Sequence, residues 1–171
     1  MKLIKLTVLT SLLFVLAFSM TSCEKNAEKR TTTDYEKTGI ILSGAQETPA
    51  VPSPALGTMD VRYSKETRTL TYKVTWSGLT DSVSLIHIHG LAPSGFAAGI
   101  VQNIVHTSNS IFPQRTNGRF TFLRSGTISG TLLADGVAVK EQDILNGVYY
   151  MNIHTPAYPG GEIRGQINFI Q

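Results

Sequence analysis

The sequence has very little cysteine. One cysteine, Cys23, occurs among 171 residues, so no disulfide can form within the chain. Its place directly after an apolar N-terminal run excludes a cysteine nucleophile in a folded active site. Charged residues are also sparse, at 16% of the chain. Because no cluster of Lys and Arg is interleaved with aromatic residues, nucleic acid is not an expected partner.

The common enzyme signatures are missing as well. No Gly-x-Ser-x-Gly segment is present, which argues against a serine hydrolase elbow. Nothing in the sequence brings two acids together for glycoside chemistry; the aspartates are scattered, at Asp60, Asp81, Asp135 and Asp143. No glycine-rich loop joins a strand to a helix. The glycines at 160, 161 and 165 are therefore expected to serve tight turns and close approach of strands, not phosphate binding.

The N-terminus has the features of an export signal. Two lysines precede an apolar run from Leu6 to Phe18, and small or polar residues follow, so residues 1–22 are predicted to be a signal peptide. A lone cysteine at this point resembles the lipidation site of bacterial lipoproteins. We expect an exported protein anchored to a membrane through lipidated Cys23, in the periplasm or at the cell surface. The alternative is an unmodified thiol after an ordinary signal peptide.

The rest of the chain predicts one all-β domain. Residues 23–38 are polar and mixed in charge and are expected to be a flexible tether, leaving residues 39–171 for a single domain. The expected strands are 39–43, 57–63, 69–76, 83–89, 100–106, 120–124, 127–133, 148–154 and 162–170. Eight or so short strands with many glycine turns favour an antiparallel Greek-key β-sandwich or barrel.

Details of the pattern support this fold. The second and third strands should form a hairpin because both alternate cleanly, and Tyr72 and Trp76 are expected in the core. Residues 44–57 hold several prolines and should form an ordered loop, as should the small-residue segment 90–99. The one plausible helical piece lies within 138–147.

Three histidines are the principal candidate site. His87 and His89 are two residues apart on an expected strand, so their side chains share a face opposite two isoleucines. His154 has a similar position on a later strand. Three neutral imidazoles with an open coordination position suit copper or zinc, with His106 as a fourth candidate ligand. The alternative is that the histidines fasten the loop around residues 156–161 through backbone carbonyls or Glu162.

Three charged residues are candidates for supporting roles around this site. Glu47 could order the proline-containing loop or act as a ligand or its hydrogen-bonding partner. Glu162 and Arg164 alternate with Ile163, so both are expected to point outward from the last strand, about 7 Å apart. They could form an exposed ion pair of small energetic weight, or orient an imidazole and an anion.

The sequence resembles the chordin-type (CHRD) domain in three ordered blocks, residues 42–49, 87–92 and 152–167. This family includes repeats in the animal secreted protein chordin, which binds growth factors of the bone morphogenetic class, and many single-domain bacterial exported proteins. The resemblance covers about residues 39–170. It implies the fold and an extracytoplasmic location more than a function, and the likeness to chordin repeats motivates a binding module whose ligand could be a protein or a glycan.

A more distant similarity is to copper-zinc superoxide dismutases, which carry a His-x-His strand and a later strand histidine as copper ligands. That likeness implies copper ligation by His87, His89 and His154, with Arg164 in the place of the arginine that guides the anion. The chain lacks the zinc-loop cluster of His and Asp and the disulfide pair. We therefore expect a non-catalytic binding or structural module of the cell envelope, with a copper- or zinc-binding redox protein as the alternative.

Overall fold

The computed structural model describes residues 34–105, 115–116, 119–120 and 124–169. The predicted signal peptide, Cys23 and His106 lie outside these residues. The strands are β1 (Tyr35–Ser43), β2 (Leu56–Ser64), β3 (Thr69–Ser77), β4 (Leu85–Gly90), β5 (Ile100–Val105), β6 (Arg115–Thr116), β7 (Arg119–Phe120), β8 (Gly126–Leu133), β9 (Tyr149–Thr155) and β10 (Tyr158–Ile167). Two short helices accompany them, η1 (Gly44–Gln46) and α2 (Glu141–Leu145).

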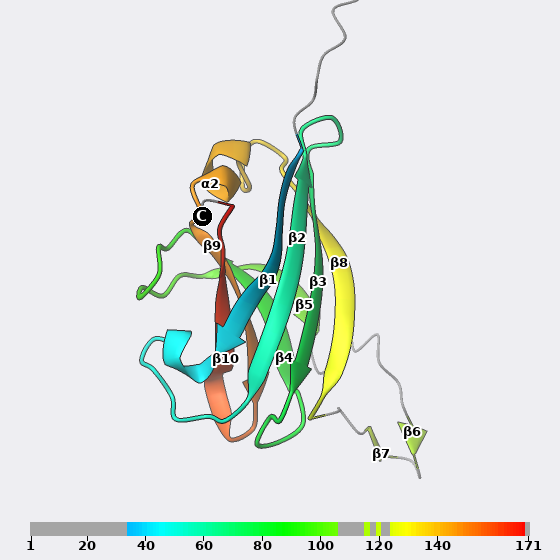
Figure 1. The fold of residues 1–171 in the computed structure, drawn as a ribbon, viewed down its shortest axis with the longest axis vertical. Helices are drawn as coiled ribbons and strands as arrows, with labels where there is room; N and C mark the ends of the chain where they lie inside the picture. Colours follow the sequence, from blue (N-terminus) through cyan, green and yellow to red (C-terminus); the bar gives the residue numbers. More distant parts are fainter. Residues whose placement is uncertain (1–33, 106–114, 117–118, 121–123, 170–171) are drawn as a thin grey trace, which may run out of the picture. The chain divides into compact units, whose positions relative to one another are not determined.

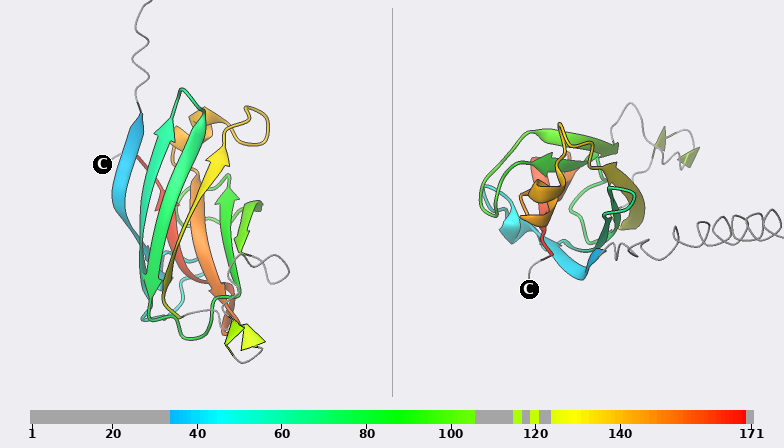
Figure 2. Two further views of the ribbon diagram at one scale, coloured as in Figure 1. Left: turned by 90° about the vertical axis from the view of Figure 1, so that its right-hand side faces the viewer. Right: turned by 90° about the horizontal axis from the view of Figure 1, so that it is seen from above.

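Eight strands form one antiparallel sheet in the order β5-β4-β9-β10-β1-β2-β3-β8. The sheet curls around a common interior into a nearly closed barrel (Figures 1 and 2). The chain passes from β3 to β4 and from β8 to β9, which are not neighbours in the sheet. The predicted all-β antiparallel barrel of about eight strands is confirmed. In the described part of the chain, no helix is long and apolar enough to cross a membrane.

The interior follows from the alternation in the sequence. Every second residue of β2 and β3 is buried, and the two strands pair in one uninterrupted register from Leu56↔Ser77 to Ser64↔Thr69. Tyr72 and Trp76 are both buried, as predicted. The opposite wall comes from the apolar residues of β4, β9 and β10, namely Ile86, Ile88, Met151, Ile153, Ile163 and Ile167. Burial of this apolar surface is the main driving force for the fold.

The seam between the two edge strands, β5 and β8, is bridged by a side chain. Nε2 of Gln102 on β5 donates a 2.8 Å hydrogen bond to the carbonyl of Thr131 on β8. Its Oε1 accepts a 3.3 Å bond from the hydroxyl of Tyr72. Gly130 makes room for this phenol, since a Cβ there would lie 2.3 Å from the Tyr72 oxygen. The side chain of Gln102 thus joins the two edge strands at the seam, with the Tyr72 hydroxyl as its second partner.

The first strand begins earlier than predicted. β1 starts at Tyr35, so residues 35–38 belong to the sheet and not to a flexible tether. The polar composition of residues 35–38 predicts a tether, but the segment is held in the sheet by contacts that Tyr35 makes with distant residues. The Tyr35 ring meets Phe169 edge-on, with ring centroids 6.0 Å apart, and Lys65 lies 5.3 Å from the Tyr35 ring centroid.

Two other boundaries differ in the C-terminal part. The expected turn over 156–161 is tighter, because β10 already begins at Tyr158 and pairs with Thr155 before the register shifts ahead of Ile163. The expected helical piece is reduced to the five residues of α2. Of the expected strand 120–124, only Phe120 is described as strand, in β7.

The outer face of β4, β9 and β10 is polar, yet it is buried. Glu162 and Arg164 were expected to be exposed, but they are 0% and 2% exposed. The reason lies in the connections: the loop after η1 and the loop formed by residues 91–99 fold over this side of the barrel (Figure 1). Their hydrogen bonds to the polar face, described below, hold them there. The barrel therefore has a second buried layer, polar in composition, outside its apolar interior.

Glu162 shows how this layer is satisfied. Its Oε1 accepts hydrogen bonds from the Ser53 hydroxyl (2.7 Å) and the Thr80 backbone N–H (2.8 Å). Its Oε2 accepts from the hydroxyls of Thr80 (3.0 Å) and Thr155 (2.7 Å). Among the described residues Glu162 forms no ion pair with Arg164. The Glu162 carboxylate thus joins the loop that contains Ser53 and the loop that contains Thr80 to the sheet, through four hydrogen-bond donors.

Replacing Glu162 by Ala should destabilise the domain strongly. The change leaves a buried backbone N–H and three hydroxyls without their acceptor, and we expect the free energy of unfolding to fall by about 2–4 kcal/mol. Urea denaturation would measure the loss. The matched control is Glu36→Ala on the exposed face of β1, expected within about 0.5 kcal/mol of wild type. Equal effects of the two substitutions would contradict this account of Glu162.

Candidate metal centre

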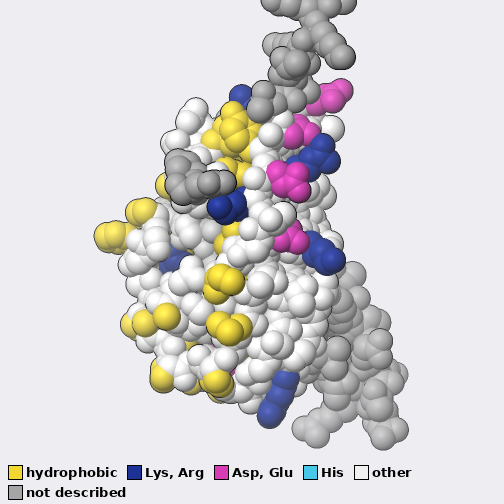
Figure 3. Space-filling model, in the orientation of Figure 1, with side chains coloured by type: hydrophobic (Ala, Val, Ile, Leu, Met, Phe, Trp, Pro, Cys, Tyr) yellow, Lys and Arg dark blue, Asp and Glu magenta, His cyan; other side chains and the backbone are white. Residues whose placement is uncertain are grey.

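The structure brings the three predicted histidines together. His87 and His89 lie on β4, His154 lies on the neighbouring strand β9, and all three point to the buried polar side of the sheet. They are 4%, 8% and 5% exposed. Ring centroids are 4.8 Å apart for His87–His154, 5.4 Å for His87–His89 and 6.3 Å for His89–His154. In the face shown in Figure 3, none of the described histidines reaches the surface.

Two of the rings are oriented by backbone carbonyls. Nδ1 of His89 lies 3.0 Å from the Ala98 carbonyl oxygen, and Nδ1 of His154 lies 3.0 Å from the Pro159 carbonyl oxygen. A carbonyl only accepts, so both Nδ1 atoms carry the proton and donate. In the neutral ring, Nε2 then has the free lone pair. This is the tautomer that a metal-binding histidine needs, held by the kind of partner that such histidines use.

The remaining ring nitrogens converge. One ligand atom from each histidine can be chosen so that all three lie within 4.8 Å of one another. In the described part of the chain no other group of three His, Cys, Asp or Glu does this. Nε2 of His89 is buried and makes no hydrogen bond within the described residues. Three imidazoles in this arrangement can bind a cation such as Zn²⁺ or Cu²⁺ through nitrogen.

The environment keeps His154 neutral. Burial lowers the pKa of His154, and the nearby charge of a protonated His89 lowers it further, while the hydrogen bond to Pro159 opposes both. A proton therefore competes less with a cation for His154 than it would for an exposed histidine. The same hydrogen bond fastens the 156–161 segment to the sheet, so the loop-fastening role anticipated from the sequence is also present. It uses Nδ1 alone and leaves Nε2 for a ligand.

Three side chains are stacked at one side of the site, namely His89, Tyr150 and Arg164. The Tyr150 ring lies parallel to the His89 ring, with centroids 4.9 Å apart and planes 4° apart. On its other face, Cζ of Arg164 is 3.4 Å from the ring centroid. Arg164 then donates through Nη1 to the Phe96 carbonyl (2.9 Å) and through Nη2 to Gln166 Oε1 (3.0 Å). The guanidinium is thus used to hold the 91–99 loop, not to guide an anion from solvent as the dismutase likeness implied.

Glu47 and Asn152 lie close to Arg164: Asn152 is its register partner on β9, and Arg164 donates a 3.3 Å hydrogen bond to Thr48, which follows Glu47. The Glu47 carboxylate is buried, and its Oε1 has no hydrogen-bond partner within the described residues. Both lie over Gly161, where a Cβ would be 2.3 Å from Glu47 Oε1 and 2.7 Å from Asn152 Nδ2. The φ of Gly161, +124°, also favours glycine. Glu47 further lines a pocket of about 180 Å³ between its own loop and residues 157–161.

Asn152 was not anticipated as a site residue. It is buried, it lies opposite His87 in the β4–β9 register, and its Oδ1 is 2.9 Å from Nε2 of His154. The alternation already placed Asn152 and His154 on one face of the strand, so its position could be predicted. Its burial could not, because the covering loops come from distant parts of the sequence.

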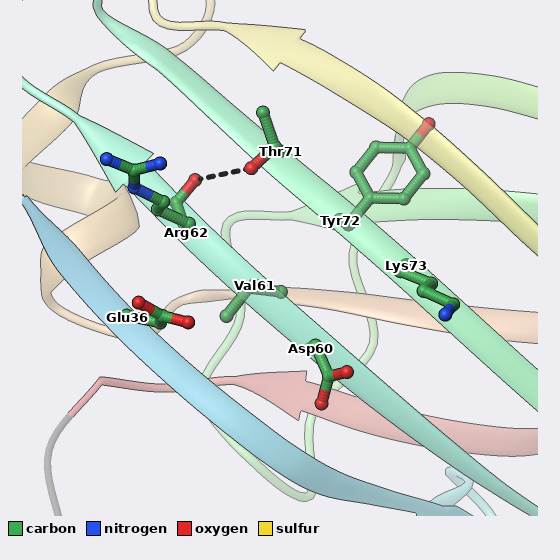
Figure 4. A pocket seen from close by; sticks show the side chains of 7 residues that line it. All are labelled: Glu36, Asp60, Val61, Arg62, Thr71, Tyr72 and Lys73. Atoms are coloured by element: carbon green, nitrogen blue, oxygen red, sulfur yellow. Dashed lines mark hydrogen bonds between the residues drawn. The ribbon is translucent and has the colours of Figure 1, made fainter.

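A second depression, of about 260 Å³, lies on the outer face of β1, β2 and β3 (Figure 4). Exposed charges of opposite sign are partners in the strand register there, Glu36 with Arg62 and Asp60 with Lys73. Thr71 donates a 3.2 Å hydrogen bond to the Arg62 carbonyl. These neighbouring opposite charges compensate one another on an open surface, so this depression is a weaker candidate than the histidine cluster.

The Glu47 carboxyl should make stability depend on pH. Burial raises the pKa of Glu47 from 4.5 to about 7, although the charge of Arg164 opposes this. Between these pH values native Glu47 retains a proton that the unfolded chain releases, so the free energy of unfolding falls as pH rises. The shift corresponds to about 3 kcal/mol. In urea denaturation of metal-free protein, the stability of wild type relative to Glu47→Gln should fall by this order from pH 4.5 to 8. A difference independent of pH would contradict the raised pKa.

Comparison with known proteins assigns the family. Residues 38–167 match the family model described as the CHRD domain, and this range contains the three histidines together with Glu47, Asn152, Glu162 and Arg164. No curated protein and no solved structure matches the chain significantly. The resemblance found in the three sequence blocks is thereby confirmed, and the chain belongs to the CHRD domain family.

Proposed function

We propose that this CHRD domain binds one divalent transition-metal ion, zinc or copper, through His87, His89 and His154, and serves as a non-catalytic binding module of the cell envelope. The observation that carries the proposal is the pair of carbonyl-held rings. Two of the three histidines have Nδ1 committed to a backbone carbonyl, so each of these rings has Nε2 left as its ligand atom, and one nitrogen from each of the three rings lies within 4.8 Å of the others.

The electrostatics support a cation at this point. Three neutral imidazoles bring no charge of their own. The Glu47 carboxylate lies beside the same glycine, Gly161, as the amide nitrogen of Asn152, whose oxygen faces His154. A bound divalent ion would place its charge in a buried layer rich in carbonyl oxygens, where desolvation is offset by direct ligation. Since burial favours neutral His154, binding should persist below the ordinary pKa of histidine.

The surroundings favour binding over catalysis. The donors of Arg164 and the hydroxyl of Tyr150 are engaged with the 91–99 loop, so neither is directed at a reacting group. Redox chemistry is the second candidate, favoured by the open coordination position that three ligands would leave. Superoxide consumption by copper-loaded protein, abolished in His154→Ala, would select this second candidate.

Titration with Zn²⁺ or Cu²⁺ should reveal about one tight site per chain. Replacing any one of the three histidines by alanine should weaken binding by at least about 100-fold, because a ligand is lost outright. Calorimetry on metal-free protein measures the affinity, and at 100 times the dissociation constant the metal should stabilise the fold by about 2.7 kcal/mol.

The matched control for these titrations is Asn103→Ala. Asn103 is exposed on β5 directly opposite His87 in the strand register, so it tests a change close to the site but on its solvent side. We expect affinity within about threefold of wild type. Wild-type protein that binds no tighter than the three histidine variants would refute the metal site.

We also propose that Cys23 carries the lipid that anchors the domain to the membrane. The support is its position after an apolar segment with the length of a signal peptide, followed by a polar stretch before β1. Expressed as the full chain in a bacterium, wild-type protein should sediment with membranes and require detergent for release. Cys23→Ser should move it to the soluble or secreted fraction, and mass spectrometry should find the acyl chains on wild type alone. Equal fractionation of the two proteins would refute the anchor.

A further inference from the structure

The amide of Asn152 lies among the three histidines and faces one of them directly. Its Oδ1 is 2.9 Å from Nε2 of His154, and both side chains are buried. Asn152 is also the register partner of His87 on the adjacent strand. The amide therefore borders the same small volume as the imidazoles.

When the His154 imidazole is neutral, no hydrogen lies between its Nε2 and Oδ1 of Asn152. The Pro159 carbonyl accepts a hydrogen bond from Nδ1–H of His154, so Nε2 of the neutral ring carries a lone pair. An amide oxygen also presents only lone pairs. Two acceptors 2.9 Å apart repel one another unless a positive centre lies next to both. A proton on Nε2 or a metal ion would provide one, and a metal ion is the centre that the three converging imidazoles are suited to bind.

Glu47 determines which end of the amide faces the histidines. The amide nitrogen of Asn152 lies on the side of the Glu47 carboxylate, whose negative charge favours the N–H end of the amide in that position. Asn152 Nδ2 and Glu47 Oε1 both lie close to Gly161, where the missing side chain leaves them room. With the nitrogen on that side, the oxygen is directed toward His154.

We propose that the Asn152 amide oxygen is the fourth ligand of the metal site, and that Glu47 is the positioning residue that orients it. The inference rests on the proposed metal-binding function and specifies the donor set as three imidazole nitrogens and one carbonyl-type oxygen. A separation of 2.9 Å is that of two ligands at about 90° on one ion, given metal–ligand bonds of about 2.0–2.2 Å, and a small movement would open it to the wider tetrahedral spacing.

This donor set has a consequence for metal choice. An amide oxygen is a hard donor that suits divalent ions, whereas Cu⁺ prefers soft sulfur ligands and gains little from it. Asn152 should therefore contribute to binding of Zn²⁺ and Cu²⁺ but not of Cu⁺. The site would hold a divalent ion in preference to monovalent copper.

The test compares Asn152→Ala with Asn152→Asp in the purified domain-containing chain. We expect Asn152→Ala to lose about 10–100-fold in affinity for Zn²⁺ and Cu²⁺ while affinity for Cu⁺ changes less than about threefold. Asn152→Asp keeps an oxygen donor and should bind the divalent ions at least as tightly as wild type. The Cu²⁺ electron paramagnetic resonance spectrum should shift in Asn152→Ala, because one ligand is exchanged.

Glu47 is tested by a conservative and a disruptive change. Glu47→Gln retains a carbonyl oxygen that can accept from the Asn152 amide, so wild-type affinity and spectrum should be preserved. Glu47→Leu removes the acceptor and should reproduce the Asn152→Ala spectrum and its loss of Zn²⁺ affinity. Circular dichroism of each metal-free variant shows whether it is folded, and a misfolded alanine variant is replaced by Asn152→Ser.

The outcomes separate this inference from the proposed function. Wild-type protein that binds no divalent metal refutes the metal site and the fourth ligand together. Wild-type protein that binds metal, with Asn152→Ala unchanged in affinity and spectrum, overturns only the fourth ligand. Equal losses for Zn²⁺, Cu²⁺ and Cu⁺ would also overturn it, since they indicate that Asn152 merely supports the His154 ring.

Discussion

The hydrogen bonds between two loops and the outer face of β4, β9 and β10 are the constraint on which the rest of this structure depends. A barrel of this size buries its apolar residues inside and normally leaves the outer face of its strands to water. Here that face is covered, so each polar group on it must find a partner in the covering loops. Glu162, Arg164 and Nδ1 of His89 do so through loop hydroxyls or backbone groups, and Nδ1 of His154 bonds the carbonyl of Pro159 at the start of β10. Covering the face is what makes a buried histidine cluster possible.

Much of the fold was predictable, because alternation determines which residues of an antiparallel strand share a face. It correctly predicted the β2–β3 hairpin, the apolar interior and the common face of His87, His89 and His154. Their proximity followed only once β4 was seen beside β9, a pairing between segments about sixty residues apart that no local pattern encodes. The early start of β1 was missed because Tyr35 packs against Phe169, at the other end of the described chain.

The errors at Glu162 and Arg164 have a different cause. Alternation predicts correctly that both side chains point away from the barrel interior. A side chain that points away from the interior is not necessarily exposed to water, and these two are buried. Whether an outward side chain meets water depends on loops whose course is set by distant contacts, such as Ser53 and Thr80 with Glu162. The same limitation concealed Asn152. An asparagine beside a strand histidine has no distinctive sequence signal until the covering loop, with Glu47 in it, excludes solvent.

The seam between β5 and β8 has a consequence for how the barrel opens. Most other neighbours around the ring, such as β2 and β3, are joined by continuous backbone ladders, while β1 and β10 meet at the single register pair Ser43↔Arg164. At the seam, Gln102 alone supplies the described bridge to Thr131. Separating the two edges therefore breaks fewer described bonds than parting a laddered pair such as β2 and β3, and partial opening is expected to be easier at the seam than between those strands. Because β5 pairs with β4, which carries His87 and His89, such an opening would reach the histidine strand from its outer edge while the apolar wall of β1, β2 and β3 stays closed.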